Sequence, residues 1–228
     1  MVRASVDRTF YASWILANGW AEAVGLGTTL VLGWLIGPKI DQATGPVVIV
    51  LGAVTAVVLG TLLEGVVVGF AQVGVLRRRL PSIAREAWIV ATAIGAGVAW
   101  VLGMIPSTLM ALTVPAAPAA QPAEPSVLLQ YGLALMLGSA LGVILGGAQW
   151  FVLRRHVARA SRWIAANAVA WAVGMTLIFV GMDRVPWDGG AASIVVGIFL
   201  VTLLVGAVVG AIHGRVLMHL IGQASTES

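Results

Sequence analysis

The chain contains no cysteine and few charged residues, and both absences limit what it can be. Without cysteine it has no disulfide, no thiolate metal site, no iron–sulfur cluster and no cysteine nucleophile. Charged residues make up 10% of its 228 residues, whereas an ordinary soluble domain carries about 25%. With 60% hydrophobic residues and a mean hydropathy of +1.00, the composition indicates a protein of the lipid bilayer.

Six apolar stretches are long enough to cross a membrane, since a transmembrane helix needs about 20 predominantly apolar residues. The connections between them are short, and none is polar and long enough to form a soluble domain. We therefore expect an all-α membrane protein with a single integral membrane domain over residues 1–228. The predicted spans are Ser13–Ile36, Pro46–Leu76, Ala87–Leu112, Ser126–Leu153, Trp163–Met182 and Ala192–Ile221.

One sequence pattern occurs three times, at the end of every second apolar stretch. Its copies, which start at Gly65, Gly142 and Gly206, are GVVVGFAQVGVLRR, GVILGGAQWFVLRR and GAVVGAIHGRVLMH. The stretch before each copy opens with a shorter echo, WILAN, WIVAT or WIAAN. The chain is thus predicted to be a triplication. Its internal repeats, 13–79, 87–155 and 162–219, would form three tandem helical hairpins in a pseudo-threefold bundle.

Each copy of the pattern carries two glycines four residues apart, which lie on one helix face and let a neighbouring backbone approach closely. We expect these glycine faces to point toward the centre of the bundle. The predicted helix-packing positions are Gly65, Gly69, Gly142, Gly146, Gly206 and Gly210. The tryptophans that open the echo, Trp14, Trp88 and Trp163, are expected to anchor the helices at the level of the lipid headgroups.

The basic residues divide unequally between the two sides of the predicted bundle. Of the 13 Lys and Arg residues, only Lys39 and Arg184 fall on one side, which leaves 13 − 2 = 11 on the other. By the positive-inside rule, both termini are predicted to be cytoplasmic. Topology and anionic lipid then explain the net charge of +4 without a nucleic-acid partner. The arginines expected at lipid headgroups are Arg77, Arg78, Arg79, Arg154 and Arg155.

Several polar side chains fall inside the predicted spans and form a candidate intramembrane polar site. One set follows each glycine pair, and another lies four residues after an opening tryptophan. One interpretation is a set of interhelical hydrogen bonds that stabilise the bundle; the other is a polar ring that lines a vestibule. The candidate residues are Asn18, Glu22, Glu64, Gln72, Gln149, Asn167 and His213.

Only the first repeat carries acids inside its predicted spans, and these are Glu22 and Glu64. An ionisable group at membrane depth indicates a proton relay, a cation site or a counter-ion. The alternative is a protonated carboxyl group that donates one hydrogen bond. At 1.5 Å per residue, Glu22 lies about 12 Å beyond Trp14 and Glu64 about 19 Å before Arg77. We therefore expect the two acids at a similar depth.

Motifs for enzymatic chemistry are missing from the sequence. GSALG at Gly138 does not fit a nucleophile elbow, Asp183 and Asp188 fall in a predicted turn, and no H-E-x-x-H motif occurs. Three scattered histidines support neither haem nor metal binding. We expect a non-enzymatic protein with no cofactor and no metal site.

The run GAQWFVLRR, together with WIAANAVAWAVG further along the chain, resembles a large set of uncharacterised bacterial multi-pass membrane proteins. These proteins are built around repeated glycine and Q-W-x-V-L-R segments, and the resemblance covers most of the chain. It implies a bacterial inner-membrane protein and carries no site residues across. The third copy departs from the pattern, with His213 in place of glutamine and Met218 in place of arginine.

Three functions remain open on the sequence alone. The leading hypothesis is a bundle that binds or conducts a small polar solute, a proton or a cation through the acids of the first repeat. The second is a packing or assembly subunit that serves as a scaffold in a larger membrane complex, with another protein or a second copy of the chain as partner. The third is a lipid-binding sensor that uses the arginine-rich loops.

Overall fold

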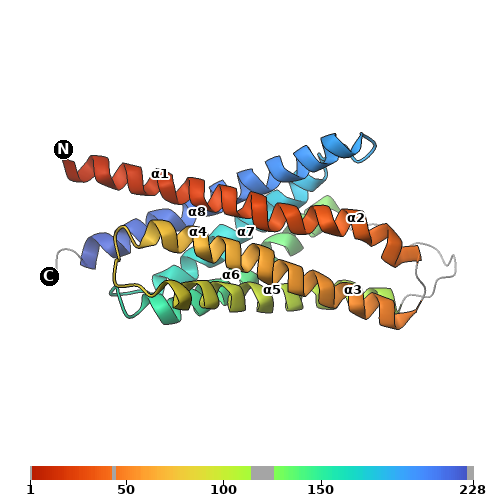
Figure 1. Ribbon diagram of the computed structural model, residues 1–228, viewed down its shortest axis with the longest axis horizontal. Helices are drawn as coiled ribbons and strands as arrows, with labels where there is room; N and C mark the ends of the chain where they lie inside the picture. Colours follow the sequence, from red (N-terminus) through yellow and green to blue (C-terminus); the bar gives the residue numbers. More distant parts are fainter. Residues whose placement is uncertain (1, 43–44, 114–125, 225–228) are drawn as a thin grey trace.

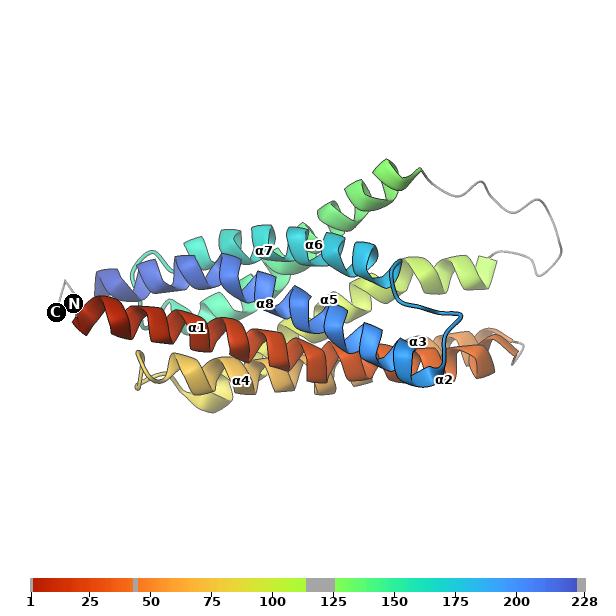
Figure 2. The same ribbon diagram turned by 90° about the horizontal axis from the view of Figure 1, so that it is seen from above.

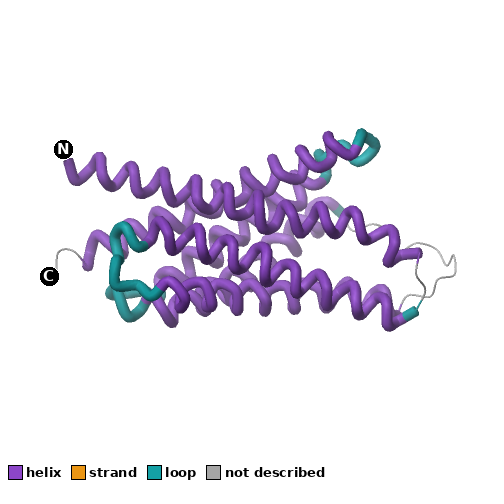
Figure 3. Tube along the Cα trace, viewed as in Figure 1, coloured by secondary structure: helices purple, strands orange, loops and turns teal. Residues whose placement is uncertain are grey.

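The computed structural model describes residues 2–42, 45–113 and 126–224. Within these residues the chain consists of helices and connecting turns, with no strand (Figure 3). Six helices are long and apolar enough to cross a membrane, which confirms the six predicted spans and supports a multi-pass membrane protein. They are Arg8–Pro38, Pro46–Leu76, Arg85–Thr113, Val127–Leu153, Arg162–Met182 and Ala191–Gln223.

The first two spans differ from the other four because each contains a π-helical segment. In the first span, η1 (Ala23–Gly27) joins α1 (Val2–Glu22) to α2 (Thr28–Gln42). In the second, η2 (Gly60–Gly65) joins α3 (Pro46–Leu59) to α4 (Val66–Leu76). The remaining spans are continuous α-helices, α5 (Arg85–Thr113), α6 (Val127–Leu153), α7 (Arg162–Met182) and α8 (Ala191–Ala224).

The two ends of the bundle differ in shape and in charge. The helix α1 begins, and α8 ends, at the same end as the loops 77–84 and 154–161, which carry six of the twelve arginines (Figure 1). We call this the arginine-rich end and the opposite one the far end. Figure 2 shows the helices diverging toward the far end, where the start of α6 points away from α2 and α3.

Each glycine-bearing helix packs against the helix that opens the next repeat. The helix α4 and the segment η2 contact α5, α6 contacts α7, and α8 contacts α1. Added Cβ atoms on the first glycine of each pair show how close these contacts are. A Cβ on Gly65 would lie 2.9 Å from the Ala93 Cα atom, and one on Gly206 would lie 2.5 Å from the Asn18 carbonyl oxygen.

The other glycines of the pattern make equivalent contacts. A Cβ on Gly142 would meet the carbonyl oxygen of Asn167, and one on Gly146 would lie 2.9 Å from the Asn167 Cβ atom. For Gly69 the nearest atom is the Ile89 Cα at 3.0 Å, and for Gly210 it is the Asn18 Cβ at 2.9 Å. The six predicted packing positions therefore all lie at close helix–helix contacts. Each glycine pair faces one neighbouring helix, because close backbone approach requires a single partner surface.

Candidate functional site

Three tryptophans lie in the core of the bundle near the arginine-rich end. Trp14, Trp88 and Trp163 are all fully buried, with 0% of the surface of each exposed. The centroid of the Trp163 ring lies 6.2 Å from that of Trp14 and 6.3 Å from that of Trp88. The expectation that these residues anchor the helices at the headgroups is wrong, because their rings contact protein on every side.

Each of these indoles donates its N–H to a polar side chain of the repeated pattern. A buried indole N–H usually finds an acceptor, and each copy of the pattern supplies one from a neighbouring helix. The bonds are Trp88 Nε1 to Gln72 Oε1 at 3.2 Å, Trp163 Nε1 to Gln149 Oε1 at 3.0 Å, and Trp14 Nε1 to His213 Nδ1 at 3.1 Å. Glutamine and histidine therefore have the same role at this position.

Amide side chains join two of these pairs into one network. Gln149 Nε2 donates to Gln72 Oε1 at 2.9 Å and to Thr92 Oγ1 at 3.0 Å. Gln72 Nε2 donates to Asn18 Oδ1 at 2.9 Å. Asn18 and Asn167 donate to carbonyl oxygens four residues earlier in their own helices, at 2.8 and 2.9 Å. The predicted amides and His213 thus form a buried hydrogen-bonded layer, and they do not surround an open vestibule.

Apolar side chains pack around this layer. Leu76, Leu153 and Leu217, which are equivalent positions of the repeated pattern, are completely buried and belong to one cluster with the three tryptophans. The cluster includes Leu80 and Ile83 from the loop between α4 and α5. The described residues thus close the bundle toward the arginine-rich end.

The two acids of the first repeat lie further toward the far end. Glu22 is buried, with 2% of its surface exposed, and its Oε2 atom has no hydrogen-bond partner. Glu64 is half-buried, and its Oε2 atom accepts a 2.8 Å hydrogen bond from Trp100 Nε1. The two carboxyl groups are close enough to interact electrostatically, and among the described residues no basic side chain interacts with either.

Both acids border segments in which the helix changes from α to π geometry. The segment η1 follows Glu22 directly, and Glu64 lies within η2. These segments pack against each other, since a Cβ on Gly25 would lie 2.7 Å from the Glu64 Cα atom. The Trp100 ring packs on Gly60, where a Cβ would overlap it. π-Helical turns are rare and frequently mark functional sites, and in the described chain both of them occur beside these acids.

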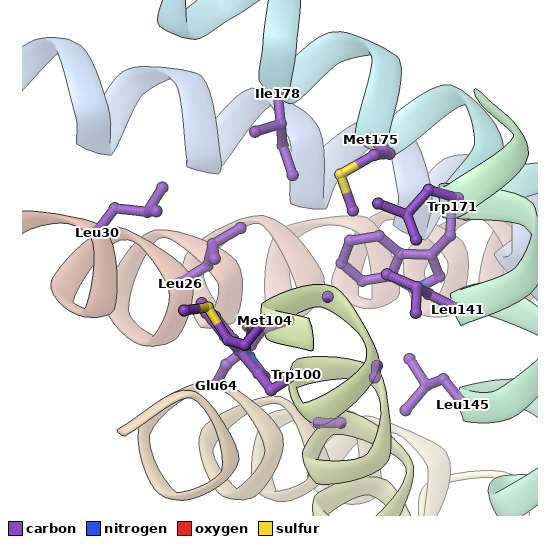
Figure 4. A pocket seen from close by; sticks show the side chains of 14 residues that line it. Leu26, Leu30, Glu64, Trp100, Met104, Leu141, Leu145, Trp171, Met175 and Ile178 are labelled. Atoms are coloured by element: carbon purple, nitrogen blue, oxygen red, sulfur yellow. Dashed lines mark hydrogen bonds between the residues drawn. The ribbon is translucent and has the colours of Figure 1, made fainter. Parts of the chain in front are cut away.

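A cavity of about 240 Å³ lies beside Glu64. The Glu64 carboxyl group is the one ionisable group among its lining residues, and the other side chains around it are apolar or aromatic. Figure 4 shows these side chains converging on one space from several helices. They include Trp100 and Met104 from α5, Leu141 and Leu145 from α6, and Trp171 and Met175 from α7.

A second cavity of about 610 Å³ adjoins the first and continues toward the far end between α2, α3, α5 and α8. The two cavities share three lining residues, Leu30, Trp100 and Met104. No lysine, arginine or histidine is among the described residues that line either cavity. Together they form a mostly apolar space, with the hydroxyl groups of Thr29, Thr55, Ser107 and Thr108 around the larger cavity, and Glu64 is the one acid among the described lining residues.

Sequence reasoning identified the two acids and missed the aromatic residues around them. Trp171 occupies the repeat position that is Glu22 in the first copy and Ala96 in the second. Both Trp171 and Ala96 line the smaller cavity. The three repeats thus carry an acid, a methyl group and a large ring at one equivalent position. This variation was the sequence signal that the repeats differ at this depth of the bundle.

The arginines predicted at lipid headgroups lie in or next to the loops of the arginine-rich end. Arg79 is half-buried, and its guanidinium carbon lies 5.6 Å from the centre of the Phe10 ring. The others, Arg77, Arg78, Arg154 and Arg155, are exposed. Four of the five side chains are therefore accessible to a membrane surface.

The residues of the site are the one source of information on its chemistry. No family model, curated protein or solved structure matches the chain. Within the described residues, no group of three or more His, Asp or Glu side chains could hold a metal ion. What the site offers is a carboxyl group in an apolar cavity, with a second carboxyl group buried close by.

Proposed function

We propose that the protein is a membrane protein that binds a small molecule in the cavity beside Glu64. The observation that carries this proposal is a carboxyl group in the wall of an apolar cavity, next to a buried Glu22 whose Oε2 atom lacks a partner. Unpaired polar groups are costly in hydrocarbon, and intramembrane acids mark ligand or ion pathways by default. A ligand that interacts with these carboxyl groups would offset that cost.

Binding is better supported than conduction. A pathway for protons or ions would have to continue from Glu64 to the arginine-rich end. In between lie the hydrogen-bonded layer around Gln72 and Gln149 and the apolar cluster around Leu76 and Leu153. A packing subunit, in turn, would not need an intramembrane cavity with an acid in its wall. We therefore propose a binding protein.

We further propose that the bundle consists of three tandem hairpins about a pseudo-threefold axis. The tryptophan of the second repeat pairs with the polar residue of the first, that of the third with the second, and that of the first with the third. This cyclic order is what a closed arrangement of three equivalent hairpins requires. The first hairpin then differs from its siblings by the acid that it contributes to the ligand site.

We place the chain in a bacterial inner membrane with both termini in the cytoplasm, on the strength of the charge bias and the sequence resemblance. A reporter fused after Ala119, in the connection between α5 and α6 that lies outside the described residues, should then read outside. A reporter fused after Ser228 should read inside. Alkaline phosphatase and green fluorescent protein fusions measure the two cases, and the reverse pattern contradicts this topology.

Filling the cavity tests the proposed function. Gly103 lines the smaller cavity, and a Cβ atom placed on it meets no other atom within 4 Å. Gly103→Leu should therefore fold normally and occupy part of the cavity. Gly132→Leu is the matched control, because Gly132 is exposed on α6, lines neither cavity and also has free space at its Cβ.

The measurement is the amount of small molecule that co-purifies with each variant from native membrane, extracted with organic solvent and quantified by mass spectrometry per mole of protein. We expect wild type and Gly132→Leu to retain the same molecule in near-stoichiometric amount. Gly103→Leu should retain at least about tenfold less, which corresponds to a loss of about 1.4 kcal/mol in binding. Equal retention by Gly103→Leu and Gly132→Leu would contradict binding in this cavity.

A further inference from the structure

We infer that the ligand of this cavity is a lipophilic amine, whose cationic nitrogen sits at the Glu64 carboxyl group and whose apolar body fills the cavity. The inference rests on the proposed function and adds the chemical class of the ligand. It follows from four features of the site, namely its charge, the lack of other oxygen-bearing side chains around the smaller cavity, its aromatic walls and its continuation into a second, mostly apolar cavity.

The charge of the site calls for a cation. Glu64 and the adjacent Glu22 are the acids of the site, and the described residues that line the two cavities include no basic side chain. An anionic ligand would meet repulsion from the carboxyl groups with no positive group to compensate. A cation would supply a positively charged partner, which the described lining residues do not offer to these acids, because buried charges are normally paired.

The walls of the cavity exclude a metal ion as that cation. Calcium takes six to eight oxygen ligands and magnesium about six, most of them often water. Here the oxygen-bearing side chain of the cavity wall is Glu64 alone, and the rest of the lining is apolar or aromatic. A cation that enters this space must therefore carry its own apolar surface, as a lipophilic amine does.

The aromatic walls suit an ammonium group. Trp100 and Trp171 both line the cavity, and the Trp100 ring is held by its hydrogen bond to Glu64. A cation near the face of a tryptophan is attracted by the ring quadrupole, and the attraction is strongest where water is excluded. The Glu64 carboxyl group would pair with the cationic nitrogen, and the Trp100 ring beside it would contact the same nitrogen.

The remaining lining suits the apolar part of such a molecule. Met104 and Met175 are flexible and polarisable, and methionine is over-represented at surfaces that accept ligands of varied shape. The larger cavity beyond Leu30 and Trp100 gives an extended tail a path toward the far end. The site is thus suited to an aralkyl or alkyl amine.

A matched pair of probes tests the inference. The pair is 4-phenylbutylamine and 4-phenylbutanol, which have similar apolar bodies and differ in the charge of the head group. Binding is measured by equilibrium dialysis against the purified protein in lipid nanodiscs, with empty nanodiscs subtracted. The variants are Glu64→Gln, Gly103→Leu and the control Gly132→Leu, each checked for an unchanged thermal denaturation midpoint.

We expect wild type and Gly132→Leu to bind the amine at least about tenfold more tightly than the alcohol, because an ion pair adds a charge-assisted bond. Glu64→Gln should lose that preference while it keeps its affinity for the alcohol within about threefold, since the apolar contacts are unchanged. Gly103→Leu should weaken both probes. Competition by the alcohol against the amine should show that they share one site.

Two other outcomes separate the inference from the proposed function. If wild type binds both probes equally and Gly103→Leu weakens both, the cavity is a binding site and the inference of an amine ligand is wrong. If amine binding is unchanged in Glu64→Gln and in Gly103→Leu, the amine binds elsewhere and the inference is also wrong. In that second case the proposed function is tested separately, by the amount of small molecule that co-purifies from native membrane with wild type, Gly103→Leu and Gly132→Leu.

Discussion

Replacing Gly142 by leucine is expected to lower the free energy of unfolding more than any other substitution considered. A Cβ atom at this position would overlap the carbonyl oxygen of Asn167 and lie 2.9 Å from the Ala168 Cα atom. Both are backbone atoms, so α6 and α7 would have to move apart. Overpacking in a well-packed core costs about 1–3 kcal/mol, and separating two helices that rely on close packing should reach at least the upper end of that range.

The control for this substitution lies on the same helix. Gly147 is half-buried on α6, and a Cβ placed on it meets no other atom within 4 Å. Gly147→Leu should therefore change stability by no more than about 1 kcal/mol, which is the helix-propensity difference between the two residues. The yield of monodisperse protein after size-exclusion chromatography and the free energy of unfolding in a detergent titration measure both. Similar stability for the two variants would contradict the α6–α7 contact.

Gln149→Leu is expected to have the second largest effect. The Gln149 amide accepts from Trp163 Nε1 and donates to Gln72 and Thr92, and all four side chains are buried. Leucine would leave the indole N–H of Trp163 without its acceptor and remove two further bonds. A buried donor left unpaired costs about 1–3 kcal/mol, so the free energy of unfolding should fall by about 3 kcal/mol.

Two further variants distinguish the network from a general effect of lost polarity. Gln130→Leu alters a glutamine on the same helix that, in the described part of the chain, has no side-chain hydrogen bond, and it should be nearly neutral. Gln149→His should lose less stability than Gln149→Leu, because His213 accepts from Trp14 at the equivalent position. If all three substitutions have equal effects, the hydrogen-bonded layer does not stabilise the bundle.

Hydropathy and repeat spacing predicted much of the fold. The six predicted spans agree with the observed helices to within a few residues, because the length of an apolar stretch is a local property. The glycine positions at close helix contacts could also be identified, since a spacing of four residues places both on one helix face. The sequence did not indicate which neighbouring helix each face would meet, because the rotation of each helix depends on packing between repeats.

The candidate site could be predicted only in part, for the same reason. Glu22 and Glu64 were identified because acids are rare inside membrane spans. Glu64, which accepts the hydrogen bond from Trp100, lies within the π-helical segment η2, and a π-helical turn shifts the register of the side chains that follow it. No local sequence signal indicated that segment. The core tryptophans were predicted at the membrane interface, because the residues next to a tryptophan in the sequence do not show whether it lies at the interface or in the core.

The most direct test is a density map of the protein in lipid nanodiscs prepared from native membrane, at a resolution that shows side chains. We expect a non-protein molecule in the space between α5, α6 and α7, with one polar atom within hydrogen-bonding distance of the Glu64 carboxyl group. The smaller cavity of about 240 Å³ should keep the walls described here, with Trp100 bonded to Glu64. A space filled by rearranged Trp100 and Trp171 side chains, with no molecule beside Glu64, would contradict the proposed binding site.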